Sequence, residues 1–66
     1  MTTREVVGKQ PEHIRWAIED YRKDYKNPAL DRAETRAALA GYVNGLRDAG
    51  AITDRERQIL FVYGTV

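Results

Sequence analysis

Apolar residues recur at three- and four-residue steps along most of the chain, which is the period of an amphipathic helix. The pattern predicts helices over residues 11–26, 32–49 and 54–63. The first helix turns one apolar face inward, made of Ile14, Ile18, Tyr21 and Tyr25. The second does the same with Leu39, Tyr42, Val43 and Leu46. The chain is therefore expected to be an all-α protein, a compact three-helix unit.

Residues that start and stop helices stand at the edges of these segments. Asn27-Pro28 should end the first helix, because the residue before a proline is pushed out of the α region. Asp31 and Thr53 each stand three positions before a glutamate, which is the spacing of a capping box at a helix start. Gly50 is placed to cap the second helix and Gly64 to end the third. The turn between the second and third helices is therefore predicted to be short.

The first nine residues lack a pattern long enough to form an element alone. They carry Val6 and Val7 beside Gly8, too few apolar residues for an independent strand pair. We expect an arm that is mobile or docks on another surface. The predicted organisation is a flexible N-terminal arm over residues 1–9 and a single helical domain over 10–66, because 66 residues leave no room for a second core.

Composition limits how so small a core can be stabilised. The chain has no cysteine and its one histidine is His13, so neither a disulfide framework, a thiolate zinc site nor a histidine cluster can form. A core of this size usually needs a disulfide, a metal or a partner subunit. Because 42% of the residues are hydrophobic, a folded core is expected, and we predict that oligomerisation stabilises it.

Charge and motif content narrow the function classes. The net charge of +1 supplies little long-range attraction for nucleic acid or an acidic membrane. No apolar run approaches the roughly 20 residues that span a bilayer, and the start lacks a signal-peptide stretch. We therefore expect a soluble protein of the cytoplasm, in a bacterium or an infected host cell. With no phosphate loop, nucleophile elbow or metal-ligand spacing, we predict no enzymatic activity, no cofactor and no small-molecule substrate.

Trp16 is the most informative single residue. Helical geometry places it roughly opposite the apolar face of the first helix, among Glu12, Asp20 and Lys23. One interpretation is an anchor in a protein interface, where tryptophan is enriched. The other is that the N-terminal arm or the third helix folds over it. The pattern alone leaves both open.

Small residues form a line along the second helix at four-residue spacing. This small-residue line consists of Ala37, Gly41, Gly45 and Ala49. Interior glycines disfavour a helix by about 0.5–1 kcal/mol each, so two of them suggest that another backbone approaches closely. A helix of the same chain is the favoured neighbour, with a symmetric dimer or a foreign helix as the alternative.

The charged flank of the first helix is interpreted more simply. Arg15, Glu19, Arg22 and Lys26 have the spacing of a solvated face with ion pairs one turn apart, such as that between Arg15 and Glu19. The third helix, in contrast, is apolar nearly all round over residues 59–63. We expect that segment to be buried on several sides or to complete its burial in a partner.

The leading hypothesis is a non-enzymatic protein-binding module, an adaptor, modulator or inhibitor that is a homo-oligomer or binds a protein partner. More large or glycine-lined surfaces are predicted than one small core can bury. The candidate interface residues are Trp16, Ala37, Gly41, Gly45, Ala49, Phe61 and Tyr63.

The alternative is a small DNA-binding regulator built on a helix-turn-helix of the second and third helices. Arginines near the helix starts would contact phosphates together with free backbone amides. These helix-start arginines are Arg32, Arg36, Arg55 and Arg57. The apolar second half of the third helix argues against this alternative, because a recognition helix needs a polar exposed face.

The stretch over residues 46–56, Leu-Arg-Asp-Ala-Gly-Ala-Ile-Thr-Asp-Arg-Glu, resembles a known hairpin. It is similar to the helix, Gly-x-Ile-Thr-x-x-Glu, helix hairpin of many short bacterial and bacteriophage proteins, including SHOCT-type oligomerisation domains. The resemblance implies a small protein of a phage or mobile element that modulates a host or phage component. It transfers no catalytic or binding residue to this chain.

Overall fold

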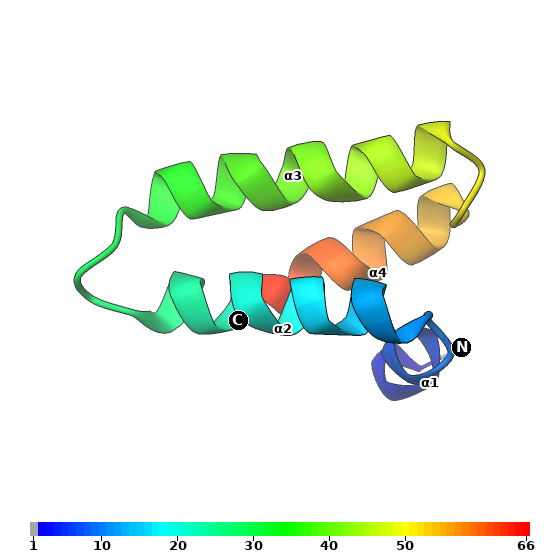
Figure 1. The fold of residues 1–66 in the computed structure, drawn as a ribbon, viewed down its shortest axis with the longest axis horizontal. Helices are drawn as coiled ribbons and strands as arrows, with labels where there is room; N and C mark the ends of the chain where they lie inside the picture. The colour runs from blue at the N-terminus through cyan, green and yellow to red at the C-terminus, as the bar shows by residue number, and fades with distance from the viewer. Residues whose placement is uncertain (1) are drawn as a thin grey trace.

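The computed structural model describes residues 2–66, which form four helices and no strand (Figure 1). The three long helices are α2 (Glu12–Lys26), α3 (Arg32–Asp48) and α4 (Asp54–Gly64). They match the predicted helices to within one residue at each end, so the all-α prediction is confirmed. The fourth helix, α1 (Thr3–Gly8), precedes them. No helix within residues 2–66 is both long and apolar enough to cross a membrane.

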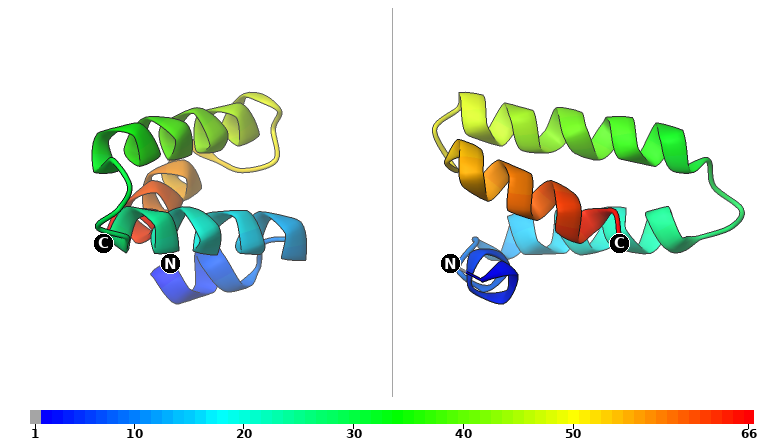
Figure 2. Two further views of the ribbon diagram at one scale, coloured as in Figure 1. Left: turned by 60° about the vertical axis from the view of Figure 1, so that its left-hand side comes forward. Right: turned by 180° about the vertical axis from the view of Figure 1, so that it is seen from behind.

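The three long helices pack on one another, and α1 packs on α4. Figure 1 shows α2 and α3 running antiparallel, with α4 inclined between them. Both views in Figure 2 place α1 on the opposite side of the molecule from α3. The molecule therefore has an α3 side and an α1 side, with α2 and α4 between.

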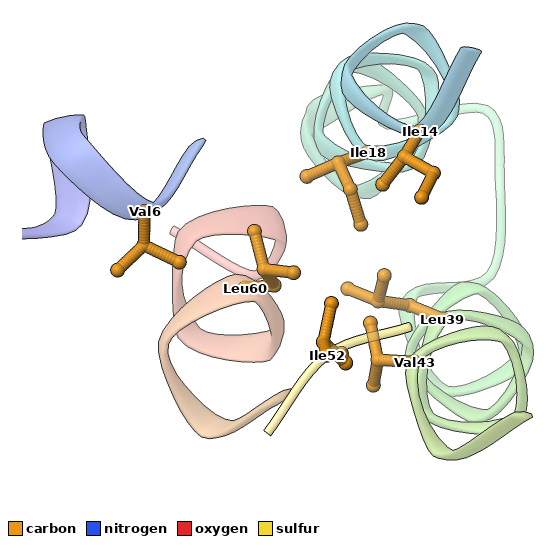
Figure 3. Close-up of a cluster of buried hydrophobic side chains, with 7 residues drawn as sticks. All are labelled: Val6, Ile14, Ile18, Leu39, Val43, Ile52 and Leu60. Carbon is orange, nitrogen blue, oxygen red and sulfur yellow. The ribbon is translucent and has the colours of Figure 1, made fainter. Parts of the chain in front are cut away.

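A single apolar cluster holds these helices together (Figure 3). Every helix contributes to it, as does the turn before α4. Its buried members are Val6, Ile14, Ile18, Leu39, Val43, Ile52 and Leu60. The residues predicted for the inner faces of the first two long helices are thus buried or pack against this cluster, with the exception of Tyr25, which is half-buried outside it.

The turn between α3 and α4 follows its sequence signals. Gly50 has φ +77°, the left-handed conformation that glycine adopts without strain. Its N–H donates to the carbonyl of Arg47, and the N–H of Ala51 donates to the carbonyl of Leu46, both at 2.9 Å. This is a Schellman motif, which satisfies the last carbonyls of α3. The predicted cap is confirmed.

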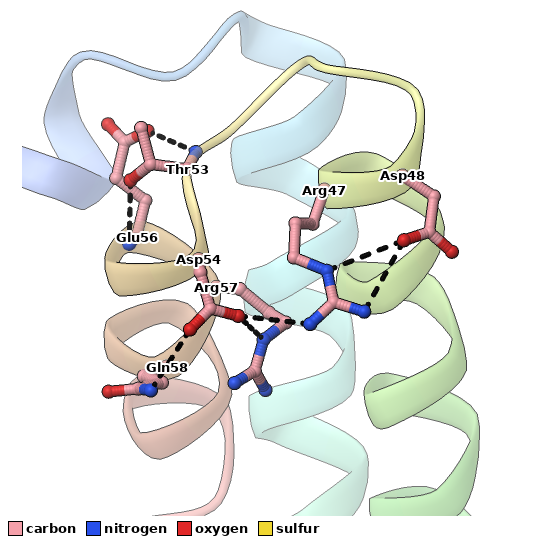
Figure 4. A network of polar contacts seen from close by, with 7 residues as sticks. All are labelled: Arg47, Asp48, Thr53, Asp54, Glu56, Arg57 and Gln58. Carbon is pink, nitrogen blue, oxygen red and sulfur yellow. Dashed lines mark hydrogen bonds and ion pairs between the residues drawn. The ribbon is translucent and has the colours of Figure 1, made fainter.

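The start of α4 carries the predicted capping box (Figure 4). The Glu56 carboxylate accepts from the N–H of Thr53 at 2.8 Å, and the Thr53 hydroxyl accepts from the N–H of Glu56 at 3.1 Å. Beside it, the Asp54 carboxylate accepts from Arg47 and Arg57, both at 2.9 Å. These contacts lower the pKa of Asp54 and join α3 to α4 across the turn.

The described part of the N-terminal segment contains a helix that was not predicted from the sequence. It forms α1, which docks on α4 with Val6 fully buried, and the Thr2 hydroxyl accepts from the N–H of Glu5 at 3.1 Å to cap the helix. Docking was one of the two possibilities expected for this segment. Six residues are too few for a helix to be stable alone, so tertiary contacts are needed besides the cap.

Two polar contacts accompany the burial of Val6. The Lys9 ammonium forms an ion pair with the carboxylate of Glu56, whose side chain is buried at the start of α4. Gln10 is also buried, and its Nε2 donates to the carbonyl of Val6 at 3.0 Å. The hydrogen bond from Lys9 is the main reason that the pKa of Glu56 is lowered. The contacts of α1 with α4 are therefore both apolar and ionic.

Gly64 ends α4, as the sequence predicts, and has a second role in packing. It is the last residue of α4 and is buried, and a Cβ placed on it would lie 2.5 Å from Cδ2 of Leu39. That distance is shorter than any comfortable carbon–carbon contact. Glycine is needed here because α4 approaches the core side chain of α3 closely.

Candidate protein-binding groove

Trp16 lies on the outer surface of α2 with 64% of its area exposed. Neither α1 nor α4 covers it, so the interpretation in which the N-terminal segment or the last helix buries it is wrong. A tryptophan side chain buries a large apolar area when a partner covers it. The interface interpretation of Trp16 stays a prediction.

A groove of about 620 Å³ runs beside Trp16, between α1, α2 and the C-terminal part of α4. Sites that take small ligands or side chains of a partner commonly have volumes of about 300–1,000 Å³. We call this site the Trp16 groove. Its lining residues are Arg4, Val7, Gly8, Arg15, Trp16, Glu19, Arg22 and Tyr63.

A polar contact between α2 and α4 shapes one wall of the Trp16 groove. The Tyr63 hydroxyl donates to the carboxylate of Glu19, and the Arg22 guanidinium carbon lies 4.4 Å from the centre of the Tyr63 ring. The hydrogen bond to Glu19 is the main cause that raises the pKa of Tyr63, and burial adds to it. The phenol therefore remains a protonated donor at neutral pH. The interpretation of Glu19 and Arg22 as a purely solvated face is wrong.

The Trp16 groove is electropositive. Three of its lining residues are arginines and one is a glutamate, a local excess of two positive charges. Within residues 2–66, none of Arg4, Arg15 and Arg22 forms an ion pair, so the predicted pair between Arg15 and Glu19 does not form. The Nε atom of Arg22 is buried and has no hydrogen-bond acceptor among these residues. The groove thus offers guanidinium donors that the chain itself leaves unused.

The small-residue line lies elsewhere, on the exposed surface of α3. A Cβ placed on Gly41 or Gly45 would meet no atom within 4 Å. The expectation that a helix of the same chain packs against this line is wrong, because the inner face of α3 is the one carrying Leu39 and Val43. Gly41 is therefore not a site of close helix approach within the chain.

The structure brings together two of the seven candidate interface residues. Trp16 and Tyr63 line the same groove, whereas Phe61 is half-buried against the core. The small-residue line is on the α3 side and does not contribute to the groove lining.

The helix-start arginines fall into two separate groups. Arg32 and Arg36 lie over the ring of Tyr25, at 5.4 Å and 5.9 Å from its centre. At the start of α4, Arg57 is paired with Asp54, and Arg55 is exposed. The two groups sit near opposite ends of α3, whose 17 residues span about 25 Å. The fold does not gather them into one patch.

Sequence reasoning missed most of the groove lining. Arg4, Val7 and Gly8 enter it because α1 folds and docks. The spacing of Thr2 and Glu5 was a local signal for the start of this helix, whereas its docking on α4 has no local signal. The spacing of Arg15, Glu19 and Arg22 does carry a signal, since it places all three on the flank of α2 next to Trp16. The sequence signal for the Trp16 groove was therefore a tryptophan outside the apolar face of its helix, with arginines at helical spacing beside it.

Within residues 2–66, no group of three or more histidine, cysteine, aspartate or glutamate side chains is placed to hold a metal ion.

The chain matches no protein-family model, no curated protein and no solved structure. Aromatic and apolar surface beside free guanidinium groups is suited to binding.

Proposed function

We propose that this protein is a non-enzymatic protein-binding module, an adaptor, modulator or inhibitor, which holds a partner protein in the Trp16 groove. The observation that carries the proposal is the exposure of Trp16 at the edge of a concave site. Tryptophan, tyrosine and arginine are the residues that most often dominate binding energy at protein interfaces, and the groove contains all three types.

The resemblance of residues 46–56 to hairpins of small bacterial and phage proteins is compatible with this role. It suggests a protein of a phage or mobile element that acts by binding a host or phage component. The DNA-binding alternative receives no comparable support, because a site using all the helix-start arginines would have to extend along α3.

Two matched substitutions test where a partner binds. A Cβ on Gly8 or on Gly41 meets no atom within 4 Å, so leucine at either position extends into open space. Gly8→Leu fills the Trp16 groove, whereas Gly41→Leu covers the small-residue line. The wild type and both variants would be used as baits in a selection from displayed short random-sequence peptides. Peptides selected by the wild type should lose binding to Gly8→Leu and to Trp16→Ala and retain it with Gly41→Leu.

Two other outcomes contradict the proposal. Peptides that bind Gly8→Leu as well as the wild type, and fail with Gly41→Leu, would move the interface to α3. A wild type that enriches no peptide beyond those taken by Gly8→Leu would remove the Trp16 groove as a protein-binding site.

Self-association is the second part of the proposal. Light scattering behind size exclusion, at several concentrations, measures the solution mass of the same three proteins. An oligomer that Gly8→Leu dissociates would mean that a second copy occupies the Trp16 groove. An oligomer that Gly41→Leu dissociates would instead place a symmetric contact on α3.

A further inference from the structure

We propose that the Trp16 groove recognises an acidic peptide segment, one in which carboxylate side chains flank a large apolar side chain. This inference rests on the proposed protein-binding function and names the chemistry of the partner. The apolar side chain packs on Trp16 and Val7. The carboxylates pair with the arginines at the edges of the groove.

The distribution of charge carries the first step. The whole chain has a net charge of +1, whereas the groove lining alone has an excess of two positive charges. The remainder of the molecule therefore has a net charge of −1, so the Trp16 groove is more positive than the rest of the chain taken together. Such a site attracts acidic groups and repels basic ones.

The arginines are free to bind, which is the second step. Arg4 and Arg15 are exposed and make no ion pair within residues 2–66. Arg22 is held in place by its stacking on Tyr63, and its Nε is buried, so only the outer end of its guanidinium can meet a partner. A guanidinium presents paired donors in a planar fork that matches a carboxylate. Arg22 is therefore pre-ordered, and the other two can adjust to the bound segment.

Glu19 does not cancel this positive charge fully. Its carboxylate accepts from the Tyr63 hydroxyl, so part of its capacity to accept hydrogen bonds is already used. Its negative charge opposes a carboxylate and a phosphate alike, so it does not distinguish the two. The apolar surface of Val7 and Trp16 is what favours a peptide with a large apolar side chain over a nucleic acid.

The peptide selection described above also tests the chemistry of the occupant. The expected result is an enrichment of aspartate and glutamate next to leucine, phenylalanine or tryptophan among peptides that bind the wild type and fail with Gly8→Leu. Replacing the acids of one selected peptide by asparagine and glutamine should weaken its affinity about tenfold. Added salt should weaken the acidic peptide more than its amide version.

Substitutions in the protein locate the carboxylate contact. Arg15→Gln should weaken the acidic peptide about threefold to fivefold and leave its amide version within about twofold. Lys26→Gln is the matched control, because it removes one positive charge from the same helix outside the groove lining. It should change neither affinity by more than about twofold.

The failures of the two proposals are distinguishable. Selected peptides that need Trp16 but carry no excess of acids, or bind equally well as amide versions, would overturn the acidic occupant and leave protein binding intact. A single-stranded thymidine oligonucleotide that displaces the selected peptide and binds more tightly would assign the groove to nucleic acid instead. Absence of any groove-dependent peptide would overturn both proposals.

Discussion

The shortest and longest helices of residues 2–66 are stabilised in different ways. α3 has 17 residues and is capped at both ends, by the Asp31 side chain at its start and by the Gly50 motif at its end. α1 has six residues, and besides its Thr2 cap it depends on Val6 and on the Lys9–Glu56 ion pair. Local signals thus cover both ends of α3, whereas α1 is too short to be stable without tertiary contacts.

This difference bears directly on the candidate site. The outer face of α3 is exposed but presents mainly alanine and glycine, which offer a partner little apolar area to bury. α1, which needs tertiary contacts to be stable, supplies one wall of the Trp16 groove. Regions of low local stability are where binding sites often lie. We therefore expect α1 to be released more easily than α3.

The largest expected effect comes from shortening one buried valine to alanine in α1 and, for comparison, one in α3. Val6 and Val43 are both fully buried, and each change to alanine should remove about 2 kcal/mol of packing free energy. Val43→Ala should lower the free energy of unfolding of the whole domain. Val6→Ala should instead release α1, so that amide hydrogen exchange accelerates over residues 3–8 while α3 keeps its protection.

The same variants link the stability of α1 to the groove. A selected peptide should bind Val6→Ala more weakly than Val43→Ala under conditions where both domains are folded. Equal acceleration of exchange in all helices of both variants would show that α1 belongs to one cooperative unit with α3, and the comparison would fail.

A second pair of substitutions separates the inner and outer faces of α3. Gly64→Ala forces a Cβ against Leu39 and should lower the free energy of unfolding by about 1.5 kcal/mol. Gly41→Ala adds the same group in open space and should raise it by about 0.5–1 kcal/mol. Urea unfolding measures both. A loss of stability in Gly41→Ala would mean that the outer face of α3 is in close contact with another chain.

The ionic attachment of α1 predicts a dependence on pH. The hydrogen bond from Lys9 and that from the Thr53 N–H lower the pKa of Glu56 below its ordinary value of 4.5. A carboxyl whose pKa is lowered on folding stabilises the fold above its unfolded pKa. That stabilisation is lost as the pH falls from about 4.5 through the folded value.

Glu56→Gln isolates this contribution, because glutamine retains the capping box and removes the charge facing Lys9. Relative to the wild type, the variant should lose about 1 kcal/mol of stability at about pH 7, and this loss should shrink as the pH falls below about 4.5. Glu34→Gln lies at an exposed position in the first turn of α3. It should change the free energy of unfolding, relative to the wild type, by less than Glu56→Gln does at about pH 7. A difference for Glu56→Gln that is the same at both pH values would contradict the ion-pair argument.

The sequence could predict those helices whose start and end are marked by residues within or next to the helix. The proline after α2, the Asp31 cap and the Gly50 turn are local, so the bounds of the long helices followed from them. α1 and the role of Gly64 depend on contacts between residues far apart in the chain. Part of the candidate site could be predicted for the same reason. Trp16 was a candidate because it lies opposite the apolar face of its helix. The wall formed by α1 could not be predicted, because it forms only when Val6 is buried.

The smallest expected effect concerns Trp16 itself. Because most of its surface is already exposed, Trp16→Ala should change the free energy of unfolding by about 0.5 kcal/mol or less. Ile18→Ala, on the buried face of the same helix, should cost about 2–5 kcal/mol and shows that the assay detects a packing residue. If Trp16→Ala lowered the free energy of unfolding as much as Ile18→Ala, Trp16 would be a packing residue that stabilises the fold. A negligible change would mean that its large side chain is not needed to hold α2 in place, and a role in binding then explains why so apolar a group stands beside free arginines.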